Sequence, residues 1–444
     1  MPHSVNRRGF LKSGLATGAL LAAGGATSSV SAVHGILSST RRRVSQEKLR
    51  VGVIGVRNRG AANLAGVRGE DIVALCDVDS NYLAQAGTEF PDAKRFADFR
   101  ELIDADNLDI DCIVISTPDH THAPAAAMAL KNGKHVYCEK PIAHTVDEAR
   151  KLGELGLTPG LATQMGTQVH AGNNYRRVVE LIRSGAIGDV TEAHAWVGKY
   201  WGDGRLTPGA QPPPQLNWDL WLGPKPEAAY IEGIHPANWR KYWSYGTGTL
   251  GDMGCHYLDL LQWALELGAP THVKAEGPPV HQVGAPRWCH TTWEFPARGS
   301  MKPCTIEWWD GGRRPEVLST LKRQDGAPIE WGDGHLFIGT EGMLLSDYGR
   351  YLLLPEENFR GFSPPQAWIP KSRGHHAEFL HAARTGSPTL CNFPYAGQLT
   401  ETVLLGTVAY RAGEGFDWDG TRGQSTSRAA NELLSEAYRE GWRL

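Results

Sequence analysis

Residues 51–60 read VGVIGVRNRG, an apolar run that leads into a glycine-rich turn. The run at 51–56 is typical of a strand buried on both faces, and the residues after it are suited to open a helix. Gly55 and Gly60 match the first and last glycines of the G-x-G-x-x-G pattern, and Arg57 stands where the middle glycine is expected. A strand, a tight turn and a helix in this order predict the first unit of a parallel α/β sheet.

The alternation of strand and helix continues downstream from this turn. We expect further buried strands at 71–76, 111–116, 135–138 and 160–164, with helices at 80–89, 122–132 and 145–156. Short apolar strands alternating with helices of this length predict a doubly wound parallel sheet. The first folded domain is therefore expected to be an α/β Rossmann domain over residues 49–168.

The pattern changes after Gly172, and a second domain is expected over residues 169–430, followed by a C-terminal tail at 431–444. A loop rich in Gly, Pro and Trp precedes a series of short alternating strands. The expected elements are helices at 173–184, 251–267 and 376–384 and strands at 190–197, 291–295, 304–309, 335–339 and 343–347. This combination predicts an α+β domain with a large open antiparallel (mixed) sheet.

The N-terminal 32 residues resemble a twin-arginine (Tat) export signal. Residues 6–12 read NRRGFLK, an apolar run of small residues follows at 15–26, and VSA at 30–32 suits cleavage. A disordered basic tail is the alternative interpretation, and retention of the segment as an anchor stays open. We expect residues 33–48 to form a polar linker. We also expect the protein to be exported, already folded, through the Tat translocon, to the periplasm or otherwise out of the cytoplasm.

Bulk composition limits the classes of partner. The formal net charge is −3, without a long run of either sign, so a nucleic-acid-binding surface is not indicated. The seven cysteines are an odd number in a long chain, which argues against a disulfide framework. The chain is therefore expected to fold in a reducing compartment around a small-molecule site.

The glycine turn and the residues that end the strands predict a dinucleotide site. Asp77 ends the second strand, where a carboxylate can accept a hydrogen bond from a ribose 2′-hydroxyl and would repel a 2′-phosphate. NAD is therefore favoured over NADP. Arg57 would either clash with a pyrophosphate or pair with it, and His122 would cap the next helix or reach the ligand. The expected cofactor-binding residues are Gly55, Arg57, Asn58, Arg59, Gly60, Asp77, Thr117, Pro118, His122, Glu139 and Lys140.

Two further motifs carry candidate chemistry. Glu139-Lys140-Pro141 follows the apolar run at 135–138, so Lys140 should project from the carboxyl edge of the parallel sheet, where such sheets bind ligands. Residues 251–256 read GDMGCH and open a helix, which places Asp252 and His256 on one face.

Together these motifs resemble those of the glucose–fructose oxidoreductase/inositol dehydrogenase (Gfo/Idh/MocA) family, over roughly residues 49–430. In that family the lysine of Glu-Lys-Pro stands beside the nicotinamide of NAD(P), and aspartate and histidine face it across the substrate. The resemblance implies Lys140, Asp252 and His256 as catalytic residues. Histidine suits proton transfer, Lys140 would stabilise developing negative charge, and Asp252 would hold a hydroxyl or orient the imidazole.

A metal site is an alternative reading of the same region. Asp252 and His256, together with His375 and His376, carry the right ligand atoms, but they do not form a compact metal-binding motif. We therefore expect no metal.

The substrate is expected to be a carbohydrate or polyol. Aromatic rings suit the C–H faces of sugars and polar side chains suit their hydroxyls. The expected substrate-binding residues are Gln164, Gln168, His170, Tyr200, Trp239, Arg240 and His256.

Three functions remain open from the sequence. The first is an NAD-dependent oxidoreductase acting on a secondary hydroxyl of a sugar, polyol or glycoside, with a tightly bound cofactor. The second is a redox-assisted glycoside hydrolase that oxidises, eliminates, adds water and reduces with recycled NAD. The third is a sugar-binding module without catalysis, which the departure at Arg57 keeps open. The family resemblance also implies a homo-oligomer.

Overall fold

The computed structural model describes residues 47–444. The expected Tat signal at 1–32 lies outside the described residues, as does most of the expected linker at 33–48. A parallel sheet of six strands forms the first half, in the order β3-β2-β1-β4-β5-β6. Its strands are β1 (Arg50–Ile54), β2 (Asp71–Cys76), β3 (Lys94–Phe96), β4 (Cys112–Ile115), β5 (His135–Cys138) and β6 (Thr163–Met165). The predicted doubly wound Rossmann sheet is confirmed.

Helices connect these strands and cover the sheet. They are α1 (Arg59–Val67), α2 (Ser80–Glu89), α3 (Phe99–Ile103), α4 (His122–Lys131) and α5 (Val146–Leu155). Local sequence sets where two of them begin. Asp79 accepts hydrogen bonds from the first amides of α2, and Thr145 and Glu148 form a reciprocal capping box at the start of α5.

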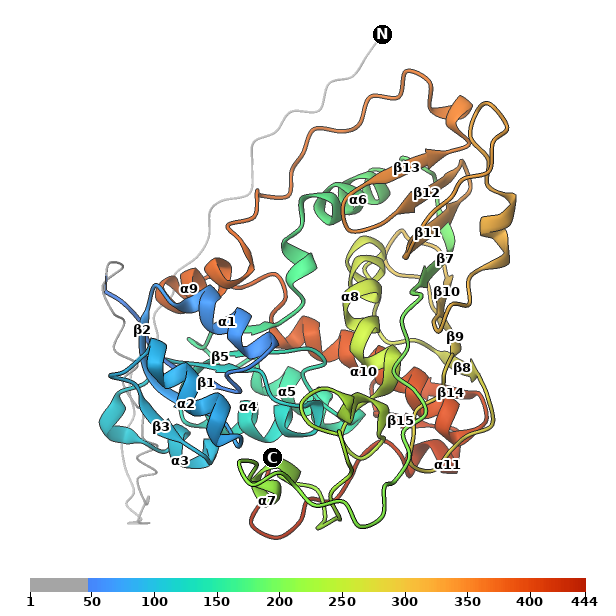
Figure 1. Ribbon diagram of the computed structural model, residues 1–444. Coiled ribbons are helices and arrows are strands. Elements are labelled where there is room, and N and C mark those ends of the chain that lie inside the picture. The colour runs from blue at the N-terminus through green and yellow to red at the C-terminus, as the bar shows by residue number, and fades with distance from the viewer. Residues whose placement is uncertain (1–46) are drawn as a thin grey trace, which may run out of the picture. The chain divides into compact units, whose positions relative to one another are not determined.

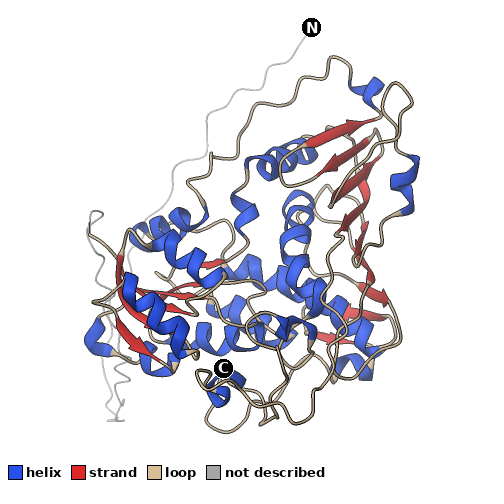
Figure 2. Cartoon of the chain, in the orientation of Figure 1, coloured by secondary structure: helices blue, strands red, loops and turns tan. Residues whose placement is uncertain are grey.

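A second sheet of nine strands lies apart from the first, in the order β13-β12-β11-β7-β10-β9-β8-β14-β15 (Figures 1 and 2). Neighbouring strands are antiparallel except β7 and β10, which run parallel, so the predicted mixed sheet is confirmed. The strands are β7 (Val190–Trp196), β8 (His272–Glu276), β9 (His290–Phe295), β10 (Cys304–Trp309), β11 (Gly334–Gly339), β12 (Met343–Ser346), β13 (Tyr351–Leu354), β14 (Phe416–Asp419) and β15 (Gln424–Ser425).

Helices α8 (Gly248–Leu265) and α10 (Phe393–Ala412) lie between the two sheets (Figure 1). The other helices of the second half of the chain are α6 (Asn173–Arg183), α7 (Trp218–Leu222), α9 (His375–Thr385) and α11 (Arg428–Asn431). The long helix α10 packs against α5 of the first sheet, against α8 and against β8 of the second sheet. Because α10 touches both halves, it fixes α8 in relation to the parallel sheet.

Packing also crosses the expected domain boundary at residue 168. Helix α9 lies on α1, and its buried Phe379 belongs to the same apolar cluster as Val51 and Val53 of β1. Near the C-terminus, the ring of Trp442 meets Phe99 of α3 edge to face, 5.6 Å between centroids. Both halves of the chain therefore complete the core around the parallel sheet.

The sequence did not reveal every element. Helix α10, with twenty residues, was missed because it is buried almost all round and shows no amphipathic period. The short strands β3 and β14 were missed as well. All seven cysteines are free and buried, in agreement with the expectation of no disulfide framework. Among residues 47–444, none of the helices combines the length and apolar character needed to cross a membrane.

Replacing the anchor of α9 should weaken the whole fold. Phe379→Ala removes a fully buried ring, and we expect it to lower the free energy of unfolding by about 3–5 kcal/mol, measured by urea denaturation. Leu157→Ala is the matched control, because that side chain is 70% exposed and its loss should change little. Equal midpoints for the two variants would contradict a structural role for α9.

Candidate active site

A cavity of about 930 Å³ opens at the carboxyl ends of the parallel strands. It lies where the strand order reverses between β1 and β4, which is the usual ligand position in such sheets. Gly55, Asp77, Thr117 and Lys140, each following a different strand, line one side of it. Residues of α8 and of the loop before it line the opposite side. Both halves of the chain therefore contribute to one site.

The glycine turn forms a cradle that side chains would fill. Gly55 has φ of +82°, and a Cβ atom there would lie 2.7 Å from the carbonyl oxygen of Ser116. A Cβ atom at Gly60 would lie 2.0 Å from the carbonyl oxygen of Gly55. Helix α1 begins after Asn58, whose side chain does not cap it, so the first amides of the helix can face an anionic group. These features fit the pyrophosphate of a dinucleotide.

Arg57, at the position of the missing glycine, does not form a clash within the turn. Its guanidinium donates to Oε1 of Gln85 at 3.2 Å and lies 5.7 Å from the centroid of the Tyr82 ring. The side chain is therefore held against α2 while still lining the cavity. Asn58 and Arg59 line the cavity too. Gly60 does not line it, but its lack of a side chain lets the start of α1 lie close to the carbonyl oxygen of Gly55.

Asp77 lies at the end of β2, as expected for a ribose-binding carboxylate. One of its oxygens accepts from the amide of Val56 at 3.0 Å and the other from the amide of Asp79 at 3.0 Å. Burial raises the pKa of Asp77 to about 6, against the lowering effect of these two amides. The group is thus charged at neutral pH and loses its charge as the pH falls through about 6.

The remaining predicted cofactor residues also lie at the cavity. Thr117, Pro118, His122 and Glu139 all line it. His122 does not cap α4: its two ring nitrogens lie 2.7 Å from the carbonyl oxygens of Thr117 and Pro141. The expectation of a capping role for His122 is therefore wrong, because the ring ties two strand-end loops together.

Glu139 and Lys140 line the cavity, and both side chains are fixed by hydrogen bonds. Oε1 of Glu139 accepts from the side-chain amides of Asn63 and Gln168, at 2.9 and 2.8 Å, and the carboxylate is buried. The peptide bond between Lys140 and Pro141 is cis. Nζ of Lys140 donates to the carbonyl oxygen and to Oδ1 of Asp252, at 2.8 and 2.7 Å. The amine is therefore fixed against the start of α8.

Asp252 is surrounded by donors. Its Oδ1 accepts from Lys140 and from Nε of Arg240, and its Oδ2 accepts from Lys199 at 2.9 Å and from the indole of Trp201 at 2.7 Å. Burial would raise the pKa of Asp252, but Lys140, Arg240 and Lys199 hold it well below its usual range. A carboxylate has about four acceptor positions, so this one is saturated by protein groups.

His256 lies one turn further along α8 and also lines the cavity. Its Nδ1 is buried and has no hydrogen-bond partner among the described residues. Burial, followed by the charge of Lys140, lowers the pKa of His256 to about 3. The imidazole is therefore neutral at pH 7, and Asp252 does not orient it by a hydrogen bond in this structure.

The structure brings some of the predicted substrate residues together and leaves others outside. Gln168, Trp239, Arg240 and His256 line the cavity. Tyr200 is 53% exposed and does not line it. Gln164 is fully buried, where its amide donates to the carbonyl oxygen of His375.

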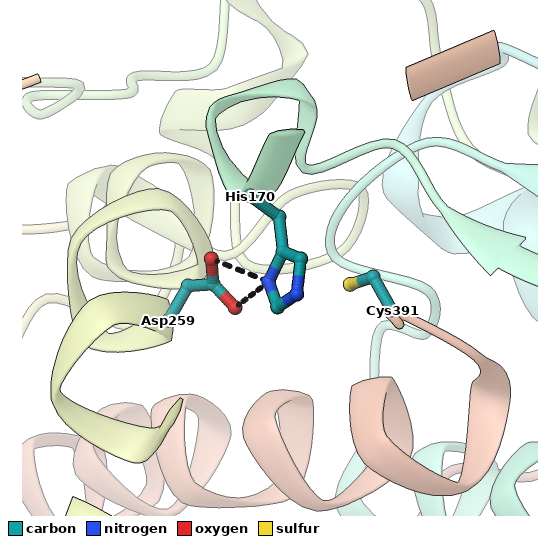
Figure 3. A group of neighbouring side chains, drawn as sticks. All are labelled: His170, Asp259 and Cys391. Atoms are coloured by element: carbon teal, nitrogen blue, oxygen red, sulfur yellow. Dashed lines mark hydrogen bonds and ion pairs between the residues drawn. The ribbon is translucent and has the colours of Figure 1, made fainter. Parts of the chain in front are cut away.

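His170 also lies away from the cavity, in the protein interior. Its Nδ1 lies 2.9 and 3.0 Å from the two carboxylate oxygens of Asp259, and its ring stacks on Trp263 at 4.1 Å. Figure 3 shows the imidazole between Asp259 and the thiol of Cys391. His170 therefore packs α8 against the end of the parallel sheet. The sequence predicted a substrate-binding role because His170 follows the last parallel strand, at the junction of the two domains.

The alternative metal set does not assemble. His375 binds the carbonyl oxygen of Met165 and His376 binds Oδ1 of Asn63, at 2.8 and 3.0 Å. In the described part of the chain, two groups bring three candidate ligand atoms within 4.8 Å of one another, and neither group includes Asp252 or His256. These groups are His170, Asp259 and Cys391, and Glu192, His194 and Glu307.

Two cavity residues were missed or undervalued from the sequence. Lys199, which contacts Asp252, belongs to no motif, and its only signal is its place soon after the strand β7. Trp201 was not among the expected substrate-binding residues, and the structure shows that its indole N–H donates to Oδ2 of Asp252. Both side chains reach the site from a loop, where spacing carries little information.

Comparison with known proteins identifies the family. Residues 49–167 match an oxidoreductase family with an NAD-binding Rossmann fold, and residues 181–301 match the C-terminal alpha/beta domain of the same family. Together these matches span more than half of the chain, which therefore belongs to the Gfo/Idh/MocA oxidoreductase family.

Named relatives share only part of the chain. It is 30% identical over 212 residues to an alpha-N-acetylgalactosaminidase of Shewanella oneidensis, covering 44% of this chain and 46% of that protein. It is 34% identical over 159 residues to an inositol 2-dehydrogenase of Rubrobacter xylanophilus, covering 35% and 45%. The chain thus matches less than half the length of these relatives.

Solved structures show the same fold over a longer stretch. One is a levoglucosan dehydrogenase in complex with NADH and levoglucosan, with a TM-score of 0.54 and 19% identity, covering 84% of this chain and 99% of that one. At this identity the likeness supports the fold alone.

Asp77 should control which dinucleotide binds. Asp77→Asn removes the charge, and we expect NAD affinity to fall roughly 10-fold or more while the discrimination against NADP relaxes. Because the pKa of Asp77 is about 6, wild-type affinity should also fall as the pH drops below 6, and that dependence should vanish in the variant. Fluorescence titration of dinucleotide-free protein measures both effects, with Asp104→Asn, an exposed carboxylate, as the control. Unchanged NAD/NADP preference would contradict the assignment.

Proposed function

We propose that this protein is an NAD-dependent oxidoreductase that acts on a secondary hydroxyl of a sugar, polyol or glycoside, with a tightly held cofactor. The observation that carries the proposal is the direct bond between Lys140 of the Rossmann half and Asp252 of α8, inside a cavity that begins at the glycine cradle. A fixed cation at the carboxyl end of the parallel strands supports the proposal, because such sheets usually bind ligands there.

We assign a separate role to each group of residues that lines the cavity. When bound, NAD supplies the hydride acceptor, held by the cradle at Gly55 and by Asp77. Lys140 uses two N–H bonds on Asp252, which leaves the third for the oxygen of the reacting hydroxyl. His256, neutral at pH 7, accepts the hydroxyl proton as the hydride leaves carbon. Asp252 is a positioning residue, since its own acceptor positions are filled.

Export gives a reason for tight binding. The Tat-like signal at residues 1–32 supports a periplasmic location, where no cytoplasmic pool of nicotinamide can replace a lost cofactor. A protein that crosses the membrane folded can carry its dinucleotide with it. A second substrate, such as another sugar with a carbonyl group, then takes the hydride back, so that the same cofactor molecule is used again within one site. We also propose that the protein assembles as a homo-oligomer.

A redox-assisted glycoside hydrolase is the second candidate, and the alpha-N-acetylgalactosaminidase among the partial relatives favours it. A hydroxyl on the ring would first be oxidised to a ketone, which acidifies the neighbouring C–H. Loss of that proton expels the aglycone, water adds to the resulting double bond, and the hydride returns to the ketone. The same residues serve both reactions, and no net oxidation occurs in the second.

Cofactor content and spectroscopy test the hydride chemistry. Mass spectrometry of denatured, as-purified protein should release NAD, and the absorbance at 340 nm should change when sugar is added. Lys140→Met should keep the dinucleotide but lose at least about 10²-fold in rate, because the group that stabilises the oxygen is gone. Lys302→Met, at an exposed lysine outside the cavity, is the control. Retained cofactor without any sugar-dependent change would instead favour a binding module.

Nitrophenyl glycosides separate the two enzymes. Incubation with purified protein and no added cofactor should release nitrophenol only if the hydrolase is correct. We expect Lys140→Met to abolish any such release, since oxidation precedes elimination. Release that survives this substitution would contradict a redox-assisted route.

A further inference from the structure

Three cations converge on one carboxylate at the end of the cavity that faces α8. Lys140, Lys199 and Arg240 all bind the single carboxylate of Asp252, at 2.7, 2.9 and 2.8 Å. One carboxylate offsets one of these charges. Among residues 47–444, no other carboxylate lies within ion-pair distance of these three cations, so they share a single partner.

Two other carboxylates line the cavity near these cations, and among the described residues neither lies within ion-pair distance of them. Asp119 is buried and accepts from the hydroxyl of Thr247. Glu139 is buried and accepts from the side-chain amides of Asn63 and Gln168. Asp77 lies beside the glycine cradle, where Arg57 and Arg59 also line the cavity.

Aromatic rings hold two of the cations in place at the cavity wall. Lys199 lies 5.0 Å from the centroid of Trp201, and the guanidinium of Arg240 lies 4.1 Å from Trp239 and 5.4 Å from Trp201. The side chains of Lys199 and Arg240 remain 43% and 22% exposed, whereas that of Lys140 is 10% exposed. Lys199 and Arg240 are therefore fixed and can still be reached from the cavity.

The imidazole of His256 responds to the same charge. Burial is the main reason for the lowered pKa of this group, but Lys140, Arg59 and Lys199 lower it further. A ligand that brought negative charge to this end would offset these cations and raise the pKa of His256 toward the range useful for proton transfer.

We propose that the substrate is an acidic sugar, whose carboxylate or sulfate group is bound by Lys199 and Arg240. Arginine and lysine with several free donors suit an oxyanion, and a guanidinium can bind it through two parallel hydrogen bonds. In the structure Asp252 is the ion-pair partner of Lys140, Lys199 and Arg240. A bound anion would pair with Lys199 and Arg240, while Asp252 stays paired with Lys140. This inference rests on the proposed function, because it names the substrate class of that same site.

Binding and turnover are measured separately to test it. Isothermal titration calorimetry on the NAD-containing protein compares D-glucuronate, D-galacturonate and D-galactose 6-sulfate with D-glucose and D-galactose. We expect at least one acid to bind about 10-fold or more tightly than its neutral counterpart. The uronates and the sulfate ester distinguish which oxyanion is recognised. Lys199→Met and Arg240→Met should each reduce the ratio of acid to neutral affinity at least about 10-fold, whereas Lys302→Met should leave it unchanged.

The outcomes separate this inference from the proposed function. Preference for an acid that disappears in Lys199→Met supports it, even if no sugar changes the nicotinamide absorbance, in which case the oxidoreductase proposal fails alone. Turnover of neutral sugars with equal or better affinity overturns the inference and leaves the oxidoreductase standing. Failure of every acid to bind overturns it as well. Circular dichroism of each variant confirms that the comparison is between folded proteins.

Discussion

The ion pair between Lys140 and Asp252 is the constraint on which the site depends. It joins the end of β5 to the start of α8, two elements whose sequences lie more than a hundred residues apart. Burying two charges is costly, and a buried pair repays this cost only when further hydrogen bonds satisfy both groups. Here Arg240, Lys199 and Trp201 complete the shell of the carboxylate. The pair therefore fixes the geometry of the cavity more than it contributes to stability.

Saturation of Asp252 changes how the family motif should be understood in this chain. The sequence suggested that an aspartate and a histidine on one helix face would act on the substrate together. In the structure the carboxylate is committed to three cations, and His256 has a buried Nδ1 without a partner. Substrate binding must then occur around the cations rather than on the carboxylate, while His256 depends on the local electrostatic potential for its basicity.

The parts of the fold that were predictable are those whose residues repeat with a clear period. Strands such as β2 and β5 and helices such as α2 were predicted at their observed bounds, because buried parallel strands are uniformly apolar and the helices between them are amphipathic. Helix α10 is apolar on nearly every side and was overlooked. Asp77, Lys140 and His256 were found because strand ends and helix faces dictate where they lie.

The sequence predicted the positions of loop residues and of buried polar residues poorly, for different reasons. Lys199 reaches the site from a loop, so no spacing rule marked it. His170 was misplaced because a histidine near a strand end can face either the cavity or the core, and only packing decides. In this chain the decision comes from Asp259 on the next turns of α8, whose carboxylate binds the imidazole in the interior. One helix therefore presents Asp252 and His256 to the cavity and uses Asp259 for its own docking.

The residues that line the cavity come from two kinds of structural element. The parallel sheet supplies the glycine cradle, Asp77 and Lys140, which are the residues we propose to hold the dinucleotide and the reacting oxygen. The loop between β7 and α8 supplies Lys199, Trp201, Trp239 and Arg240, and it is attached to the rest of the site through Asp252. Loops tolerate change better than the elements they join. Substitutions in this loop can therefore alter the charge offered to the substrate while the ion pair between Lys140 and Asp252 keeps the reacting groups in place.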